Sequence, residues 1–279
     1  MLRLRYILAA ILMILTSFNC KANSTNGDIK VISYNIRLAH KNDGENYWEN
    51  RKHASVNMIR TEEPTIIGLQ ELLKSQLDYL TKELTEYAFI GVGRDNGVEA
   101  GEFMAIFYRT EDVDLLDWGT FWLSQTPEVP SRGWDAMCRR TCTWAKFRHK
   151  ATGKTFMHFN THLDHVGNVA RREGLRLIVE RMGYMVDHTT PTFLTGDFNI
   201  PTDNEAFEML TPTLQDARKV SPKSDHRATF NGWGNASSII DHIFFRGATA
   251  HTFQVLCDEN YGAPYISDHY PVVLTATLK

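Results

Sequence analysis

Residues 192–199 read Thr-Phe-Leu-Thr-Gly-Asp-Phe-Asn, an apolar run that ends in a polar motif. The apolar part predicts a short buried strand at Thr192–Leu194. If the strand alternation continues, Asp197 and Asn199 lie on one side while Phe198 points into the core. A carboxylate and a carboxamide are poor core residues. This stretch therefore predicts a functional site at the end of a buried strand.

Six further polar motifs stand at the ends of apolar stretches along the chain. They are Tyr34-Asn35, Leu69-Gln70-Glu71, Gly101-Glu102-Phe103, Thr161-His162-Leu163-Asp164, Ile240-Asp241-His242 and Ser267-Asp268-His269. Their carboxylates and carboxamides offer the oxygen ligands that Mg²⁺ prefers, and such ions serve phosphate chemistry. One motif of this kind occurs by chance, but seven along one chain indicate a shared site.

Apolar patterning predicts many strands and few helices. The expected strands are Ile29–Ile36, Thr65–Leu69, Phe89–Gly93, Phe103–Arg109, Val113–Leu123, Thr143–Arg148, Thr155–His162, Thr192–Leu194, Ser238–Phe245, Thr252–Leu256 and Val272–Leu278. The expected helices are Tyr47–Arg60, Ser75–Leu84, Val169–Val186 and a short one at Phe207–Leu210. This pattern is typical of an α/β fold in which two sheets pack face to face with helices outside.

Length and composition fit one large globular domain. The chain has 279 residues, of which 43% are hydrophobic, and no Pro/Gly/Ser-rich linker divides it. Its formal net charge is −3. Proteins that bind duplex DNA usually carry a basic face, so this balance favours a small or single-stranded phosphate ester.

The N-terminus reads as a targeting segment. Arg3 and Arg5 precede the apolar run Tyr6–Leu15, and polar residues follow. This is the pattern of a secretory signal peptide, and the run is too short to span a bilayer comfortably. Cleavage after Ala22 is expected, and Cys20 offers a second interpretation as a lipidated cysteine.

Two regions follow from this interpretation, a signal peptide at residues 1–22 and a catalytic domain at residues 23–279. The expected location is outside the cytoplasm, either periplasmic or secreted, or anchored to a membrane as a lipoprotein.

Three cysteines remain once the signal is removed, namely Cys138, Cys142 and Cys257. An odd number excludes a full disulfide framework. Cys138 and Cys142 are compatible with a small disulfide loop, with half of a zinc site that lacks a second pair, or with buried thiols.

The order and content of the seven motifs resemble the endonuclease/exonuclease/phosphatase superfamily, from about Ile29 to Lys279. Its members include deoxyribonuclease-like, sphingomyelinase-like and deadenylase-like metal-dependent phosphoesterases. The resemblance implies a four-layer α/β sandwich with two mixed sheets. It also implies an enzyme that uses Mg²⁺ or Mn²⁺ and cleaves phosphoester bonds by in-line attack of an activated water.

The substrate class stays open at this point. A nucleic acid, a phospholipid headgroup and a small phosphorylated metabolite all fit a phosphoesterase. The sequence implies no protein partner, and a monomer is expected. A different class of function is a non-catalytic extracellular protein that binds a phosphate ligand on the same fold, because fold does not imply function.

The resemblance assigns metal binding to three residues. Glu71 corresponds to the principal metal-binding carboxylate, and Asp268 to a possible second ligand. Asn35 belongs to the same shell, where its carboxamide would either coordinate the metal or orient Glu71.

The resemblance assigns the catalytic roles to residues from the remaining motifs. Asp197 would orient or deprotonate the attacking water. Asn199 would donate a hydrogen bond to the pentavalent phosphorus centre, where charge accumulates. His269 would contact the scissile phosphate, with Asp241 bound to its ring. A carboxylate behind an imidazole raises the imidazole pKa and fixes its tautomer.

A second imidazole pair is expected beside the first. Glu102 corresponds to the family's partner carboxylate for His162, so the two would flank the same phosphate. Arg94 lies in the Gly-rich stretch Gly91–Gly97, and its position predicts a grip on a substrate phosphate.

Overall fold

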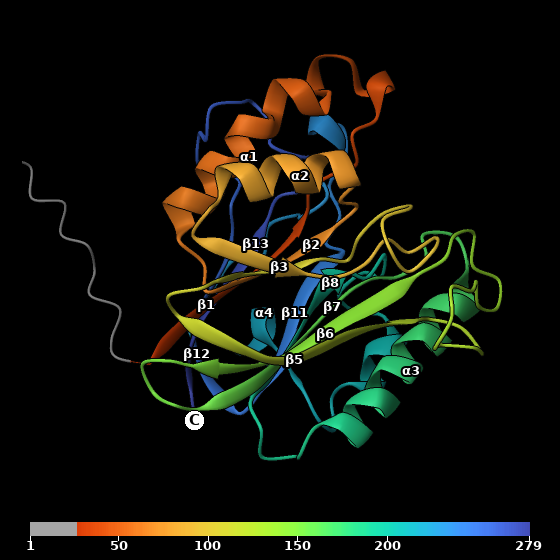
Figure 1. The fold of residues 1–279 in the computed structure, drawn as a ribbon, viewed down its shortest axis with the longest axis vertical. Helices are drawn as coiled ribbons and strands as arrows, with labels where there is room; N and C mark the ends of the chain where they lie inside the picture. Colours follow the sequence, from red (N-terminus) through yellow and green to blue (C-terminus); the bar gives the residue numbers. More distant parts are fainter. Residues whose placement is uncertain (1–26) are drawn as a thin grey trace, which may run out of the picture.

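Two β-sheets pack face to face and helices cover their outer faces in the computed structural model, which describes residues 27–279 (Figure 1). The predicted α/β sandwich is confirmed. The predicted signal peptide at residues 1–22, with Cys20, lies outside the described residues. Within residues 27–279, no helix is long and apolar enough to cross a membrane.

The first sheet has seven strands in the order β10-β12-β13-β1-β2-β4-β3. Strand β1 runs antiparallel to β13 and parallel to β2. The ends of β1 and β2 and the start of β13 therefore meet at one edge. The strands are β1 Asp28–Asn35, β2 Ile66–Gln70, β3 Tyr87–Ile90, β4 Ile106–Arg109, β10 Lys223–Ser224, β12 Ala248–Val255 and β13 Val272–Leu278.

The second sheet has six strands in the order β5-β6-β7-β8-β11-β9. Strand β7 is parallel to β8, with His162 opposite Asp197, and β11 is antiparallel to β8, with Asp241 opposite Asp197. This register brings three predicted site residues together. The strands are β5 Val113–Trp122, β6 Thr141–His149, β7 Thr155–His162, β8 Thr192–Asp197, β9 Gln215–Asp216 and β11 Asp241–Arg246.

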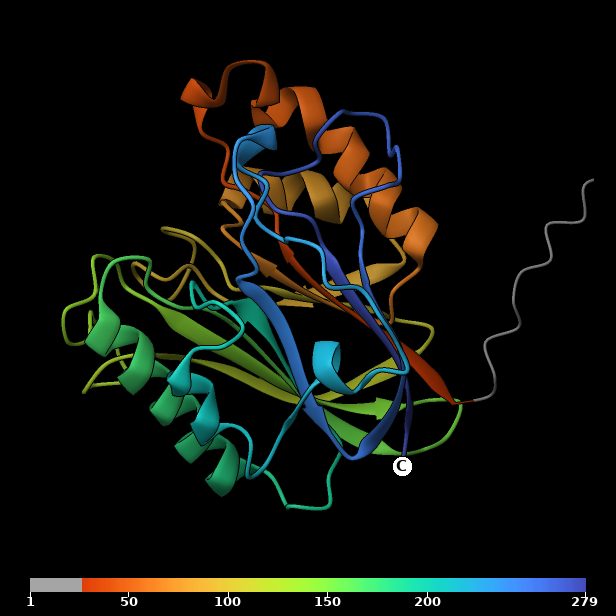
Figure 2. The ribbon, with the colours of Figure 1, turned by 180° about the vertical axis from the view of Figure 1, so that it is seen from behind.

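Helices form the outer layers, as Figures 1 and 2 show from opposite sides. Helices α1 (Trp48–Glu62) and α2 (Lys74–Glu83) cover the first sheet, and α3 (Asn168–Met185) covers the second. Helix α4 is a single turn at Ala217–Val220. Three apolar clusters result, one between the sheets and one under each helical layer, as a four-layer sandwich requires.

The observed elements follow the predicted ones with three kinds of difference. The helix expected at Phe207–Leu210 is a 3₁₀ turn at Glu205–Met209, and further 3₁₀ turns lie at Lys41–Asn46 and Gly232–Gly234. Some strand bounds also differ: β4 and β11 begin three residues later than expected, at Ile106 and Asp241, and β12 begins four residues earlier, at Ala248. Strands β9 and β10 and helix α4 were not predicted, because two to four residues are too few to show a period.

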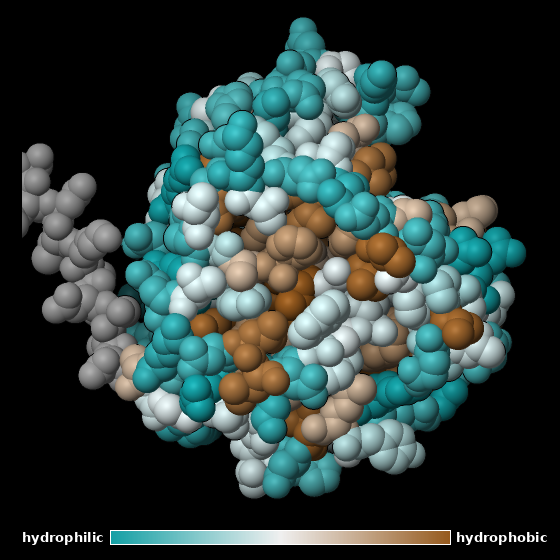
Figure 3. Space-filling model, viewed as in Figure 1, coloured by the Kyte–Doolittle hydropathy of each residue, from teal (hydrophilic) through white to brown (hydrophobic). Residues whose placement is uncertain are grey.

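Strands β3 and β5 form the free edges of the two sheets on the side seen in Figure 1. Apolar side chains reach the surface there, with Phe89 36%, Leu116 43% and Trp118 41% exposed. Figure 3 shows an apolar area over this part of the molecule.

A polar network interrupts the apolar core between the sheets. Asn160 on β7 donates to the carbonyls of Leu69 (2.8 Å) and Ala105 (3.0 Å) in the other sheet. Its side-chain oxygen accepts from Gln70 Nε2 at 2.7 Å. A Cβ at Gly68 would lie 2.5 Å from that oxygen, so only glycine allows this approach. The network fixes the two sheets to each other beneath the edge that carries the polar motifs.

Candidate active site

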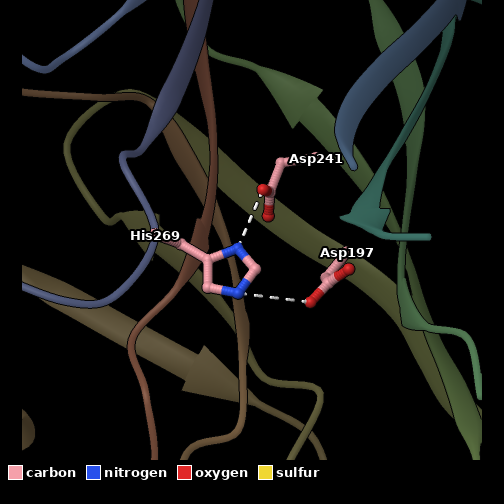
Figure 4. Close-up of side chains that lie close together, drawn as sticks. All are labelled: Asp197, Asp241 and His269. Atoms are coloured by element: carbon pink, nitrogen blue, oxygen red, sulfur yellow. Dashed lines mark hydrogen bonds and ion pairs between the residues drawn. The ribbon is translucent and has the colours of Figure 1, made fainter. Parts of the chain in front are cut away.

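Polar side chains from both sheets converge where β1, β2, β7 and β8 end and β11 and β13 begin. Figure 4 shows the centre of this group, where Asp241, His269 and Asp197 face one another. All three are almost fully buried, with exposed fractions of 0%, 4% and 2%. Residues that are up to 72 positions apart in the chain therefore share one water-poor site.

His269 bridges two carboxylates. Its Nδ1 lies 2.9 Å from Asp241 Oδ2, and its Nε2 lies 3.7 Å from Asp197 Oδ2 (Figure 4). Burial alone lowers the pKa of this imidazole, but the charges of Asp241 and Asp197 outweigh burial and raise the pKa to about 10. His269 therefore carries a positive charge at neutral pH.

Asp197 lies at the end of β8 and receives two hydrogen bonds. Asn35 Nδ2 donates to Oδ2 at 3.0 Å, and the backbone N–H of Asn199 donates to Oδ1 at 3.0 Å. Burial raises the pKa of Asp197 to about 7, against the opposing charge of His269. A carboxylate with this pKa can accept a proton from water at neutral pH.

Asn199 reaches the site by a turn and not by strand alternation. Strand β8 ends at Asp197, and Asn199 adopts a left-handed backbone with φ of 50°. Its Nδ2 donates to Leu163 O at 3.0 Å and lies 3.1 Å from His162 Nε2. Both amide protons are thus directed at protein acceptors, so in this structure Asn199 holds the ring of His162.

His162 is as buried as His269 but has different neighbours. Its Nε2 lies 3.5 Å from Asp197 Oδ2, and its Nδ1 has no hydrogen-bond partner in the described part of the chain. Burial, followed by the charges of Arg140 and Arg94, lowers the pKa of His162 well below its ordinary value. This imidazole is therefore neutral at neutral pH.

The predicted Glu102–His162 pair is absent from the described residues. Glu102 Oε2 instead accepts from Arg94 Nη1 at 2.6 Å. A permanent guanidinium charge is a stronger partner for a buried carboxylate than a neutral imidazole. Arg94 also accepts a bond from Trp122 Nε1 at its backbone carbonyl (2.7 Å). Its guanidinium, predicted to grip a phosphate, is thus paired with Glu102, while its Nε has no partner among residues 27–279.

Asn35 orients its neighbours in this structure. Its Oδ1 accepts from the backbone N–H of Arg37 at 3.0 Å. Its Nδ2 donates to Glu71 Oε1 at 3.1 Å as well as to Asp197. The amino group therefore faces the two carboxylates, and the carboxamide oxygen faces the backbone of Arg37.

Arg37 completes the site and was not predicted. Its guanidinium lies 3.9 Å from Glu71 Oε2 and 3.7 Å from Asp268 Oδ2, and it donates twice to Asp43 (3.1 and 2.9 Å). The only sequence signal was its place two residues after Asn35. Glu71 and Asp268 thus already face one cation.

The donor set of Glu71 and Asp268 fits a hard divalent cation. Both side chains stay partly exposed, at 14% and 12%, so their oxygens are open to solvent. Both are oxygen donors, which Mg²⁺ and Mn²⁺ prefer. A second group, formed by Asp197, Asp241 and His269, has ligand atoms within 4.8 Å of one another and could also hold a metal ion.

Cys138, Cys142 and Cys257 are all free. Cys142 is fully buried, and burial raises the pKa of its thiol. Neither Cys138 nor Cys142 is paired, and of the two only Cys142 is the buried thiol of the third alternative, because Cys138 is half-buried.

Known proteins resemble this chain over most of its length. An endonuclease/exonuclease/phosphatase of Bacteroides vulgatus is 37% identical with a TM-score of 0.85, covering 90% of this chain and 99% of that one. A mannosyl-6-phosphatase of Bacteroides thetaiotaomicron is 36% identical with a TM-score of 0.85, covering 90% and 100%. An uncharacterised protein of Acanthamoeba polyphaga mimivirus is 27% identical over 268 residues, which are 88% of this chain and 99% of that protein.

The family model described as endonuclease/exonuclease/phosphatase family matches residues 32–269. This range contains all seven motifs, the last of which ends at His269, and the sheets that carry them have the arrangement of the solved relatives. The chain therefore belongs to the endonuclease/exonuclease/phosphatase family of phosphoesterases.

Proposed function

We propose that this chain is an exported, divalent-metal-dependent phosphatase that hydrolyses phosphomonoesters of sugars. The observation that carries the proposal is the convergence of Asp197, His269 and Asp241 beside the carboxylates of Glu71 and Asp268. The mannosyl-6-phosphatase of Bacteroides thetaiotaomicron supports the substrate class, since it matches over 90% of this chain. The net charge of −3 also favours a small substrate over duplex DNA.

Asp197 is the base in this proposal. A water next to Oδ2 would give its proton to that oxygen as its own oxygen attacks phosphorus opposite the leaving alcohol. Asn35 and the backbone of Asn199 hold the carboxylate in place, so little reorganisation is needed during the attack.

His269 is the cation that faces the phosphate. Asp241 fixes its Nδ1, which leaves Nε2 directed towards Asp197 and the reacting atoms. Negative charge grows on the phosphoryl oxygens and the leaving oxygen during the reaction. A preformed imidazolium in a dry site stabilises that charge or donates a proton to it.

Glu71 and Asp268 would hold the metal ion, with Asn35 orienting Glu71. When bound, a divalent ion neutralises phosphate charge and polarises the bond that breaks. Arg37 lies near both carboxylates, and its positive charge offsets the repulsion between them.

Export rests on the N-terminal residues. Arg3 and Arg5 followed by Tyr6–Leu15 support a signal peptide at residues 1–22, which leaves a catalytic domain at residues 23–279. N-terminal sequencing of the mature protein from fractionated cells tests this. An intact N-terminus in the cytoplasmic fraction rejects export, and a lipid-modified Cys20 identifies the anchored form.

A substrate panel tests the activity. Mannose 6-phosphate, glucose 6-phosphate, bis-p-nitrophenyl phosphate, single-stranded RNA, plasmid DNA and sphingomyelin are each assayed with Mg²⁺, with Mn²⁺ and with excess EDTA. We expect phosphate release from the sugar phosphates with metal and none with EDTA. An Asp197→Asn variant is the matched control for contaminating phosphatases.

Each other outcome rejects a different part of the proposal. Turnover of RNA or sphingomyelin alone rejects the sugar-phosphate substrate. Full activity in EDTA, with no tightly bound metal by elemental analysis, rejects metal dependence. If the metal-loaded protein binds a phosphate ligand but turns over none of the panel, the chain is a binding protein on this fold.

A further inference from the structure

We propose that Arg51, a residue of helix α1 outside every polar motif, is a positioning residue that holds the segment after Asn35 and the segment before Asp268 in a fixed relation. The proposal rests on the metal-dependent function above, which assigns Asp268 and Glu71 to the metal, with Asn35 orienting Glu71. Its first test nevertheless requires no turnover and no metal.

Arg51 is buried and donates to backbone carbonyls from three segments. Its exposed fraction is 1%. Nη1 donates to Ile36 O at 2.6 Å and to Ile266 O at 2.9 Å. Nη2 donates to Arg37 O at 2.9 Å, and Nε donates to Asn46 O at 2.8 Å. One guanidinium thereby joins the exit of β1 to the loop before β13.

The joined carbonyls lie next to the residues that the proposed reaction uses. Ile36 directly follows Asn35, and Ile266 stands two positions before Asp268. Ser267 Oγ also donates to Asn35 O at 2.7 Å, which ties the same two segments directly. Loss of Arg51 is therefore expected to weaken the connection between these two segments and not to abolish it.

The bond to Arg37 O stabilises an unfavourable backbone. Arg37 has φ of 57°, a left-handed conformation that residues with a Cβ rarely adopt without support. Arg51 Nη2 and Gln76 Nε2 (3.0 Å) both donate to its carbonyl oxygen. This turn is what directs the guanidinium of Arg37 at Glu71 and Asp268.

Two aromatic rings keep Arg51 in place. The guanidinium carbon lies 5.2 Å from the ring centre of Trp48 and 5.5 Å from that of Trp233. Cations bind the faces of such rings favourably in a dry environment. Lysine has no planar fork of donors and cannot reproduce this set of bonds.

The loop that carries Trp233 contacts the same site segment. The backbone N–H groups of Asn231 and Gly232 donate to Asp268 O at 2.8 and 3.1 Å. Asn231 Nδ2 also donates to Ser267 O at 3.2 Å. The ring of Trp233 therefore connects Arg51 to the loop that holds the carbonyl of Asp268.

Hydrogen exchange of the metal-free protein is the first experiment. Arg51→Met keeps an apolar stem of similar length and removes all four bonds. We expect amides in residues 36–38, 231–234 and 266–269 to exchange several-fold faster than in the wild type. Arg218→Met is the matched control, because Arg218 is 3% exposed, donates to the carbonyls of Asp225 and Arg227 and lies over the ring of Phe253.

Mn²⁺ binding without substrate is the second experiment. Side chains that orient a metal ligand typically contribute 10-fold to 100-fold in affinity, so we expect Arg51→Met to weaken Mn²⁺ binding by about 10-fold or more. We expect the control to lose thermal stability with little change in Mn²⁺ affinity. Arg51→Lys should recover less than half of the lost affinity, and millimolar methylguanidinium should partly restore binding to Arg51→Ala.

The outcomes separate this inference from the proposed function. Equal exchange, or equal loss of Mn²⁺ affinity, in the Arg51 and Arg218 variants would overturn the positioning role. Unchanged Mn²⁺ affinity in a loosened Arg51→Met protein would overturn it too. A wild type that binds no Mn²⁺ rejects the proposed metal site. The connection that Arg51 makes between the two segments is still tested by hydrogen exchange alone.

Discussion

The two imidazoles of the site are equally buried and differ in almost every other respect. His269 and His162 are each 4% exposed. His269 has a carboxylate on Nδ1 and a second one near Nε2, whereas His162 has no hydrogen-bond partner on Nδ1 within residues 27–279, and the charges of two arginines lower its pKa further. The pKa is raised in the first and lowered in the second. Burial lowers the pKa of both imidazoles, and the carboxylates beside His269 outweigh it there, so neighbouring charge decides which of the two equally buried imidazoles is a cation.

Asp197 links the two sides of this comparison. Its Oδ2 lies 3.7 Å from His269 Nε2 and 3.5 Å from His162 Nε2. The proposed chemistry therefore has a cation on one side of the base and a neutral ring on the other. A family resemblance alone predicted two similar His/carboxylate pairs, and the structure has one.

The largest expected effect comes from Asp197→Asn, which removes the base from between the two imidazoles. The amide keeps the shape of the side chain but cannot take a proton from water. We expect kcat to fall by roughly 10² to 10⁴-fold with KM nearly unchanged, because the group acts in the transition state. Steady-state kinetics on the substrate found in the panel measure this. A residual rate that tracks bound metal would instead make Asp197 a metal ligand.

Replacing each histidine by alanine should distinguish the two imidazoles by the free energy of unfolding that is lost. Both changes should lower kcat by roughly 10²-fold. His269→Ala also leaves Asp241 and Asp197 buried without their cation, so we expect it to lower the free energy of unfolding by about 3 kcal/mol. His162→Ala removes a neutral ring and should cost clearly less. Urea unfolding of both variants provides the measurement, and equal losses would contradict the assigned charges.

A third buried imidazole shows what burial does without a charged partner. His158 is 0% exposed, its Nε2 lies 2.9 Å from Thr195 Oγ1, and burial lowers its pKa to about 3. As the pH falls below about 6.5, the unfolded chain binds a proton here that the folded chain does not, so stability falls. The lowered pKa of His158 accounts for a loss of about 2 kcal/mol of unfolding free energy at pH 5.

His158→Gln tests this contribution of His158 to the pH dependence of stability. The variant should lose about 2 kcal/mol less of its unfolding free energy than the wild type when the pH drops from 7 to 5. Urea unfolding at the two pH values gives the difference. An identical drop in both proteins would mean that folded His158 is protonated in the same range as the unfolded chain.

The sequence predicted the frame of the site because strands and their polar ends leave a local pattern. Strands β7 and β13 begin and end at the predicted residues, Thr155–His162 and Val272–Leu278. The motif residues accordingly meet at one edge. Periodicity and strand-end polarity depend on near neighbours in the chain, so they can be read from sequence.

The missed features depend on contacts between distant segments. Arg37 and Arg51 bind carboxylates or backbone carbonyls that any sequence offers, so their roles leave no motif. The turn at Asn199 replaces the expected alternation because β8 ends at Asp197. The partner of Glu102 was mispredicted because it is decided by the fold of the loop that carries Arg94.

Glu102 gives the smallest expected effect. Glu102→Gln keeps an oxygen that can accept the hydrogen bond from Arg94 Nη1. His162 is already neutral, so losing the negative charge of Glu102 should not change the protonation of His162 at neutral pH. We therefore expect kcat to fall by less than about 10-fold, against roughly 10²-fold if Glu102 served His162 as a partner.

Two double-mutant cycles decide between these partners. A cycle of Glu102→Gln with Arg94→Gln should give a coupling energy of about 1 kcal/mol or more in unfolding, because the two side chains share a buried charged hydrogen bond at 2.6 Å. A cycle of Glu102→Gln with His162→Ala should give close to none, in unfolding and in kcat. Strong coupling to His162 and none to Arg94 would restore the symmetric pair of imidazoles, and the contrast between the two sides of Asp197 would then have to be explained by His269 and Asp241 alone.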